Sequence, residues 1–169
     1  MAEPFNTSEQ LAALADLDRL LRDHAVTYWV FGGWAVDFHV GRITRAHDDI
    51  DIAVWSDDRA SVIPLLVGGG WSHRPQDGED GYMCFARGDV QLEIAFLARD
   101  DSGVMYTPLD DGRGEWPPTS FGEDVACLQG TCVRVVSRAS LIADKATIRE
   151  DATTAAKDRA DVARLRQTS

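Results

Sequence analysis

Apolar residues near the start of the chain repeat every three or four positions. The repeat is carried by Leu11, Leu14, Leu17 and Leu21. Because this spacing puts the four side chains on one face of a helix, the pattern predicts an amphipathic helix over residues 7–24. Thr7 and Gln10 have the spacing of a capping box at the first turn of this helix.

A strand, a turn and a short helix are expected next. The apolar run at 26–31 ends at Gly32-Gly33, which predicts a buried strand leading into a turn. Residues 34–40 are expected to form a short helix that stops at Gly41. The remaining predicted elements are a strand at 49–54, a helix at 58–67, a hairpin of 82–86 with 90–97, a hairpin of 125–127 with 131–136, and two helices at 137–150 and 155–166.

This order of elements predicts an α+β (mixed α/β) fold, in which helices flank one mixed β-sheet. Residues 1–136 are expected to form the main domain, and residues 137–169 a helical tail packed on it as one compact unit. Ser137 or Ser140 is the expected N-cap of the first tail helix. Residues 99–124 are expected to be a long acidic loop, either solvated or in contact with a cationic substrate.

The charge balance is strongly acidic. The chain has 28 Asp and Glu against 17 Lys and Arg, for a formal net charge of -11. Such a surface repels phosphate backbones, so a nucleic-acid partner is not expected, whereas a small polycation would be attracted. Solubility alone is the alternative explanation.

Cysteines and apolar runs bear on the compartment. The three cysteines have no C-x-x-C spacing and are expected to be thiols in a reducing environment. No leader-like segment precedes the first helix, and no apolar stretch reaches membrane-spanning length. A cytoplasmic protein without a membrane partner is therefore expected.

Three acidic residues point to metal chemistry. Asp49 and Asp51 share one face of their predicted strand, and Glu93 lies on the polar face of another. Oxygen-only ligands of this kind suit Mg²⁺ or Mn²⁺, and two carboxylates can bridge two ions. The Gly32-Gly33 turn ahead of a helix offers backbone N–H groups to phosphate. A metal–nucleotide substrate is the expected consequence, although each motif alone also fits a solvated strand edge or an ordinary turn.

The two motifs together resemble the nucleotidyltransferase superfamily. The resemblance is carried by Gly32-Gly33-Trp34-x-x-Asp37 and by Gly41-Arg42-x-Thr44-Arg45-x-His47-Asp48-Asp49-Ile50-Asp51. Within the superfamily the chain is most similar to the small antibiotic nucleotidyltransferases of the aminoglycoside 2''-adenylyltransferase and lincosamide types. The resemblance implies a nucleotidyltransferase-like mixed sheet and a reaction that uses two Mg²⁺ ions, or Mn²⁺, with ATP or another NTP.

The resemblance also implies residue roles. Asp49, Asp51 and Glu93 would be catalytic metal ligands, with Glu93 acting as ligand, general base or both. Phosphate contacts would come from the glycine turn, the following loop and the tail, namely Gly32, Gly33, Arg42, Arg45, His47 and Lys145. Two features depart from the usual pattern, because Trp34 replaces a serine and Glu93 replaces an aspartate.

Several residues have an alternative structural interpretation. Trp116 is expected either in the core or in a drug pocket, and Asp100 and Asp101 either in a solvated loop or against a cationic substrate. His47 and Asp37 would otherwise satisfy loop donors, and Asp48 is expected to pair with Arg45. Lys157, Asp158 and Asp161 of the tail fit helix i, i+4 pairing without a catalytic role.

The leading hypothesis is transfer of an NMP, with AMP expected, from a Mg-NTP to a hydroxyl of an aminoglycoside antibiotic, with release of pyrophosphate. The alternatives are a lincosamide acceptor, a protein or RNA acceptor as in toxin–antitoxin systems, and a non-catalytic nucleotide-binding module. A homodimer would complete the pocket of so short a chain. The acidic balance favours the aminoglycoside, because that acceptor is a polycation.

Overall fold

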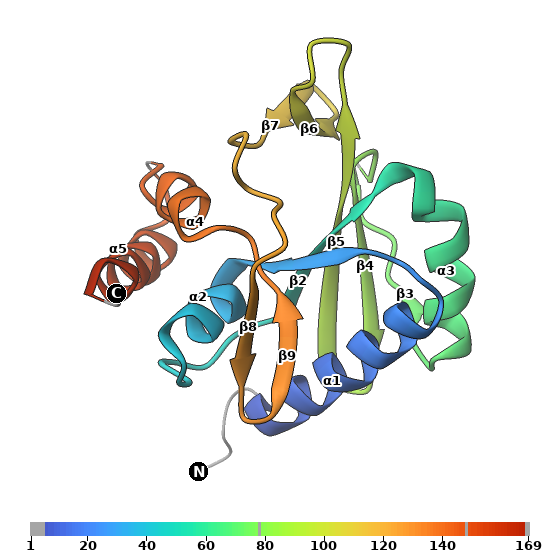
Figure 1. Cartoon of the computed structure of the whole chain (residues 1–169), viewed down its shortest axis with the longest axis horizontal. Helices are drawn as coiled ribbons and strands as arrows, with labels where there is room; N and C mark the ends of the chain where they lie inside the picture. Colours follow the sequence, from blue (N-terminus) through green and yellow to red (C-terminus); the bar gives the residue numbers. More distant parts are fainter. Residues whose placement is uncertain (1–5, 78, 148, 168–169) are drawn as a thin grey trace.

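The computed structural model describes residues 6–77, 79–147 and 149–167, and confirms the predicted α+β class (Figure 1). The helices are α1 (Thr7–Asp23), α2 (Gly32–Val40), η1 (Ser56–Asp58), α3 (Arg59–Gly68), α4 (Arg138–Lys145) and α5 (Ala152–Gln167). The strands are β1 (Tyr28–Phe31), β2 (Ile50–Trp55), β3 (Ser72–His73), β4 (Tyr82–Arg87), β5 (Val90–Arg99), β6 (Met105–Leu109), β7 (Gly112–Glu115), β8 (Val125–Leu128) and β9 (Thr131–Arg134).

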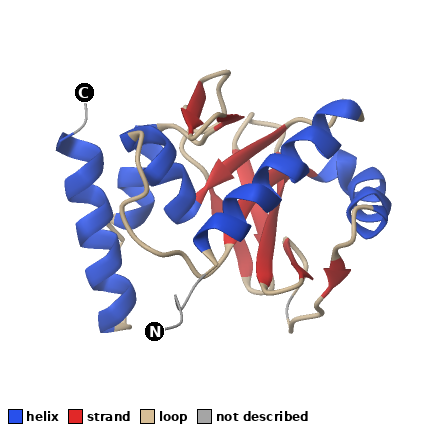
Figure 2. Cartoon of the chain, turned by 90° about the horizontal axis from the view of Figure 1, so that it is seen from below, coloured by secondary structure: helices blue, strands red, loops and turns tan. Residues whose placement is uncertain are grey.

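One mixed sheet organises the molecule. Its central order is β1-β2-β5-β4-β3, in which β2 and β5 run parallel and the other neighbours run antiparallel. The β6–β7 hairpin extends the end of β5, and β8–β9 form a separate ribbon. Figures 1 and 2 show α1 and α3 on one side of the sheet, with α2, α4 and α5 on the other and α5 outermost.

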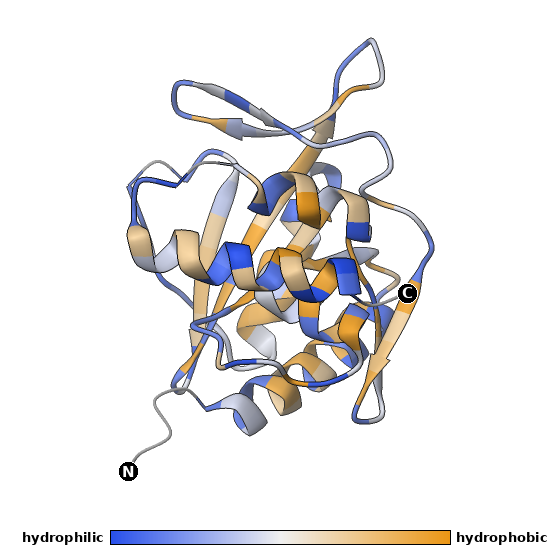
Figure 3. Ribbon diagram, turned by 90° about the vertical axis from the view of Figure 1, so that its left-hand side faces the viewer, coloured by the Kyte–Doolittle hydropathy of each residue, from blue (hydrophilic) through white to orange (hydrophobic). Residues whose placement is uncertain are grey.

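Strand alternation separates the core from the polar face. In β2, Ile50 and Ile52 point into the apolar core, and their register partners in β5 are Leu92 and Ile94. Leucines of α1 pack in the same core, and the hydropathy colouring shows the apolar character of the central strands (Figure 3). The alternate positions of β2 and β5 therefore face α2 and the tail helices.

The acidic segment 99–124 contains more structure than expected. Residues 99–124 were predicted to be a loop, but β5 continues to Arg99, and β6 and β7 form a hairpin. Asp110 and Asp111 make its two-residue turn, because Leu109 pairs with Gly112. Aspartates followed by a glycine are typical turn residues, a signal that the charge of the segment concealed.

The first turn of α1 does not contain the predicted capping box. Asn6 occupies the N-cap position without a side-chain hydrogen bond, and Gln10 is buried, with 3% of its surface exposed. The Gln10 amide instead accepts from Trp34 Nε1 at 2.8 Å and donates to the His47 carbonyl at 2.8 Å. This side chain therefore joins α1 to α2 and to the loop that precedes β2.

The tail begins as predicted but its first helix is shorter. Ser137 caps α4 by accepting from Ser140 N at 3.2 Å. The helix was expected to reach about residue 150 and ends at Lys145. The Asp144 carbonyl accepts from Thr147 N at 3.1 Å and from Arg149 Nη2 at 3.3 Å, which takes the acceptor that another α-helical turn would need.

The expectation that all cysteines are thiols was wrong. Cys127 and Cys132 face each other in the β8–β9 register and form a disulfide. The hairpin itself brings the two side chains together, and sequence spacing alone did not indicate this. Cys84 is free. In the described part of the chain, no helix has both the length and the apolar character needed to cross a bilayer.

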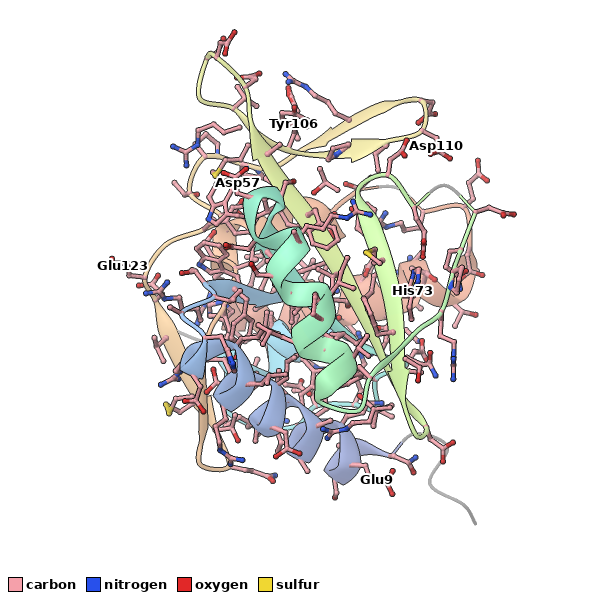
Figure 4. The ribbon with its side chains drawn as sticks, turned by 90° about the vertical axis from the view of Figure 1, so that its right-hand side faces the viewer. Glu9, Asp57, His73, Tyr106, Asp110 and Glu123 are labelled. Atoms are coloured by element: carbon pink, nitrogen blue, oxygen red, sulfur yellow. A yellow bond between two sulfur atoms is a disulfide. The ribbon has the colours of Figure 1, made fainter. Side chains whose placement is uncertain are left out.

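The Gln10 contacts yield a stability prediction. We expect Gln10→Ala to lower the free energy of unfolding by about 2–4 kcal/mol, because it leaves the buried Trp34 N–H and His47 carbonyl without partners. Glu9→Ala, at the exposed neighbouring position labelled in Figure 4, should change it by less than about 0.5 kcal/mol. Urea unfolding measures both variants, and equal effects would show that the Gln10 bridge is not stabilising.

Candidate active site

Three carboxylates converge on the polar face of the sheet. Asp51 of β2 lies in register with Glu93 of β5, and Asp49 directly precedes β2. One oxygen of each side chain lies within 4.8 Å of the others. The parallel β2–β5 pairing therefore brings together the three acids that sequence patterning identified.

The environment of this cluster opposes its negative charge. Burial raises the pKa of Asp51 well above its usual value, and the neighbouring Asp49 and Glu93 raise it further. Burial also raises the pKa of Asp49 and of Glu93, with added repulsion from Asp48 and Asp49 respectively. A divalent cation would relieve this repulsion, and hard oxygen ligands match Mg²⁺ or Mn²⁺.

The first glycine of the turn makes room for the acids. Gly32 begins α2 with φ +67°, a conformation that L side chains rarely adopt. A Cβ atom at this position would overlap Asp51 Oδ2. Glycine is therefore required both by the backbone conformation and by the close approach of the carboxylate.

The second glycine faces basic groups. A Cβ atom on Gly33 would overlap His47 Nδ1 and would lie 2.7 Å from Arg45 Nη2. His47 is buried, its Nε2 lies 2.6 Å from Asp37 Oδ2, and among the described residues Nδ1 has no hydrogen-bond partner. Because Nε2 donates to the Asp37 carboxylate, Nδ1 can donate to an anion at the N-terminus of α2 when the ring is doubly protonated.

Asp37 fixes the loop that carries these groups. Its Oδ1 accepts from Thr44 N at 3.1 Å and from Thr44 Oγ1 at 2.5 Å, while Oδ2 contacts His47. The expectation that Asp37 satisfies loop donors agrees with these contacts. The loop between α2 and β2 is thus tied to α2 by Asp37 and to α1 by Gln10.

A pocket of about 190 Å³ lies between the glycine turn and the tail. It is lined by Gly32, Gly33, Arg45, His47, Asp48, Asp49, Asp51, Lys145, Thr154, Lys157 and Asp158. The structure therefore brings together most of the expected phosphate contacts. Arg42 is exposed and is not among these lining residues.

The ion pairs around this pocket differ from those expected. Asp48 was predicted to pair with Arg45, but its carboxylate lies 3.2 Å from Lys157 Nζ. Arg45 pairs with Asp161 at 2.9 Å instead. Lys157 and Asp161 do not make the predicted i, i+4 pair: both pair with other elements, because α5 lies against the loop and α4, and Asp161 also pairs with Arg164 at 3.2 Å within α5.

The expected substrate contacts are only partly near the acids. Trp116 packs edge-on against Phe31 at 5.4 Å between ring centroids, and Phe31 is the register partner of Asp51. Asp100 directly follows the end of β5, seven residues beyond Glu93, which corresponds to about 23 Å at the usual rise per residue of a strand. The Asp100 carboxylate binds Arg113 at 2.8 Å, and Asp101 is exposed in the following turn. The structure does not bring Asp100 and Asp101 to the site.

Comparisons with known proteins agree with this arrangement. A family model described as aminoglycoside-2''-adenylyltransferase matches residues 13–165. The chain belongs to the aminoglycoside-2''-adenylyltransferase family. A 2''-aminoglycoside nucleotidyltransferase from Klebsiella pneumoniae is 38% identical over 123 residues, which are 73% of this chain and 55% of that protein. The chain thus spans about half the length of this curated relative.

Two solved structures share the fold of this chain. The lincosamide antibiotic adenylyltransferase LnuA, bound to lincomycin, superposes with a TM-score of 0.70 over 95% of this chain and 97% of that chain, at 22% identity. ANT(2'')-Ia in complex with adenylyl-2''-tobramycin gives a TM-score of 0.68 over 94% and 98%, also at 22% identity. These likenesses confirm the nucleotidyltransferase-like fold that the sequence predicted.

Two residues beside the acids were missed by sequence reasoning. Cys84 of β4 is the register partner of Glu93, and Tyr82 lies two residues away on the same face. Burial raises the pKa of Tyr82, and the nearby carboxylates of Glu93 and Asp144 raise it further. The alternation of residues 82–86 indicated that Tyr82 and Cys84 share one face of a strand. Only the register with β5 shows that this is the face that carries Glu93.

The glycine turn yields a prediction about this family member. We expect Gly32→Ala to destabilise the fold more than Gly88→Ala, because the new methyl group would overlap Asp51, while Gly88 has φ +60° and open space around it. The control should cost about 1–2 kcal/mol for the left-handed backbone alone. Urea unfolding of the two variants gives the comparison, and equal losses would show that Asp51 does not press on the turn.

Proposed function

We propose that the chain transfers a nucleoside monophosphate, AMP from ATP, to a hydroxyl of an aminoglycoside and releases pyrophosphate. The observation that carries this proposal is the convergence of Asp49, Asp51 and Glu93 beside a glycine turn and a basic pocket. The family match supports it, as does the name of the Klebsiella relative. The acids and the bases of the site would serve different parts of one metal–nucleotide substrate.

The acid cluster fits two Mg²⁺ ions, with Mn²⁺ as a substitute. Asp49, Asp51 and Glu93 would hold them, because three mutually repelling carboxylates with raised pKa values supply hard oxygen ligands. When bound, such ions neutralise phosphate charge and favour both the attacking and the leaving oxygen. Asp51 is central, because it lies between the glycine turn and Glu93.

The basic side of the pocket would bind the polyphosphate. Gly32 and Gly33 are the first two residues of α2, and their backbone N–H groups lie where the helix dipole favours negative charge. Arg45 and Lys145 line the same pocket and add charge-assisted hydrogen bonds. His47 Nδ1 lies next to Gly33, as Arg45 Nη2 does, and His47 lines the same pocket.

The chemical step joins the two sides. The acceptor hydroxyl oxygen attacks the α-phosphorus and forms the new P–O bond. The bond between the α-phosphorus and the bridging oxygen breaks, and pyrophosphate leaves with the electron pair. The hydroxyl proton passes to the Glu93 carboxylate, which lies on the same face of the sheet as its register partner Asp51.

The acceptor side is acidic and partly aromatic. Glu93 and Tyr82 share the open face of the sheet, and Phe31 packs against Trp116 beside Asp51. The formal net charge of -11 would attract a polycation over a distance, and a lincosamide with one amine gains less. We therefore assign an aminoglycoside as the acceptor, and a lincosamide is the alternative outcome of the test below.

Neutralising one carboxylate should stop the reaction. We expect Asp51→Asn to lower kcat by about a hundred- to a thousandfold, because removing a residue that supports transition-state charge commonly costs that much. EDTA should abolish the wild-type activity. Asp57→Asn, at an exposed position on η1 (Figure 4), should leave the rate unchanged. Pyrophosphate release measures all three, and a folded Asp51→Asn enzyme with wild-type turnover would contradict the proposal.

The acceptor can be identified from its mass. We expect incubation with ATP and Mg²⁺ to add one AMP to an aminoglycoside, detected by mass spectrometry, and to leave lincosamides unmodified. Because attraction of the polycation is electrostatic, KM for the aminoglycoside should rise with ionic strength. A lincosamide that gains AMP would replace the acceptor assignment. Labelling of a protein or RNA instead, or of nothing, would contradict the proposed function.

A further inference from the structure

One buried carboxylate of α5 gathers the cations of the phosphate pocket. Asp161 is fully buried, with 0% of its surface exposed. It accepts from Arg45 Nε at 3.2 Å and from Arg45 Nη2 at 2.9 Å, and its Oδ2 lies 3.1 Å from Lys145 Nζ. Burial alone would raise the pKa of Asp161, but the Arg45 hydrogen bonds and the charges of Lys145 and Arg45 lower it. Asp161 is therefore ionised in the fold.

Asp161 pairs with three cations. Arg164, on the same helix, lies 3.2 Å from Asp161 Oδ1, and the other two come from distant parts of the chain. Arg45 belongs to the loop between α2 and β2, and Lys145 is the last residue of α4. Both line the pocket at the glycine turn, whereas Asp161 itself does not line it. Arg45 Nη2 lies close enough to Gly33 that a side chain there would press on it. A single carboxylate behind the pocket wall thus contacts both cations.

We propose that Asp161 is a positioning residue that holds Arg45 and Lys145 against the polyphosphate of the NTP. This inference rests on the proposed function. The bidentate grip fixes the plane of the Arg45 guanidinium and leaves Nη1 on the other side of the group, where it donates to the Ala46 carbonyl at 3.0 Å. Lys145 is held a second time by Asp158 at 3.4 Å. Both cations are therefore ordered before any phosphate arrives, which lowers the entropy cost of binding it.

Two opposing effects make this role measurable. As a negative charge near the pocket, Asp161 repels phosphate, so its neutralisation alone would tighten phosphate binding. As a positioning group, it orders two phosphate-binding cations, so its neutralisation would weaken binding. The sign of the change therefore separates the two roles, and a residue that only stabilises the fold would change the melting temperature without changing affinity.

The direct test uses Mg²⁺–tripolyphosphate, which carries the phosphates without the nucleoside. We expect Asp161→Asn to weaken its binding by at least tenfold, measured by isothermal titration calorimetry at a temperature where the variant is folded. The control is Asp16→Asn, which removes an acid that pairs with Arg87 at 3.0 Å on the surface, and it should bind as the wild type does. Unchanged or tighter binding by Asp161→Asn would overturn the inference.

A second background tests whether Asp161 acts through the two cations. In the double variant Arg45→Gln/Lys145→Gln, the added Asp161→Asn should no longer weaken tripolyphosphate binding and should strengthen it slightly, because only the repulsion remains to be removed. Further weakening in this background would overturn the inference. If Asp161→Asn does not fold, Arg45→Lys keeps the charge and loses the bidentate grip. It should also bind at least fivefold more weakly, and wild-type affinity would overturn the inference.

The outcome is distinguishable from failure of the proposed function. If the wild type modifies an aminoglycoside and Asp161→Asn keeps the wild-type KM for ATP, only the positioning role fails. If the wild type binds tripolyphosphate in an Asp161-dependent way but modifies no acceptor, the proposed transfer fails and the positioning role stands.

Discussion

Repulsion among three carboxylates is the constraint on which the site depends. Asp49, Asp51 and Glu93 are half-buried, with oxygens within 4.8 Å of one another. Burial raises all three pKa values, and repulsion within the cluster raises those of Asp51 and Glu93 further. The strands that carry them are held by the core on their other face, where Ile50 and Leu92 are fully buried partners. Apolar burial on one face thus stabilises an unfavourable charge cluster on the other. That cluster would favour the binding of a divalent cation.

Basic side chains lie beside the acid cluster. The chain is acidic overall, yet basic side chains from the loop and from the tail meet at the glycine turn. Gly32 keeps the turn next to Asp51, and Asp37 and Gln10 hold the loop in place. Asp161 extends this support from α5, so the tail helix belongs to the pocket. The division of the chain at residue 136 and the expected homodimer stay predictions.

Local periodicity explains how much could be predicted. The alternation around Asp49 and Asp51, and the hairpin with Glu93, placed these acids on polar strand faces without any knowledge of pairing. The resemblance to antibiotic nucleotidyltransferases, now confirmed, implied that the acids of the two strands form one site. Non-local geometry was not available from the sequence, which is why Asp161 was interpreted as a helix-pairing residue and Tyr82 was missed. The β6–β7 hairpin was missed because the acidic composition outweighed its turn residues. The Cys127–Cys132 disulfide was missed because cysteine spacing was judged without the strand register.

The most direct test of the central claim is a count of bound metal ions. Electron paramagnetic resonance of Mn²⁺, titrated into the protein with a non-hydrolysable ATP analogue, reports the affinity and the number of bound ions. We predict two ions per chain for the wild type and the loss of tight binding for at least one of them in Glu93→Gln. Unchanged Mn²⁺ binding after Glu93→Gln, with the fold intact, would contradict the account, because the three carboxylates would then not act together.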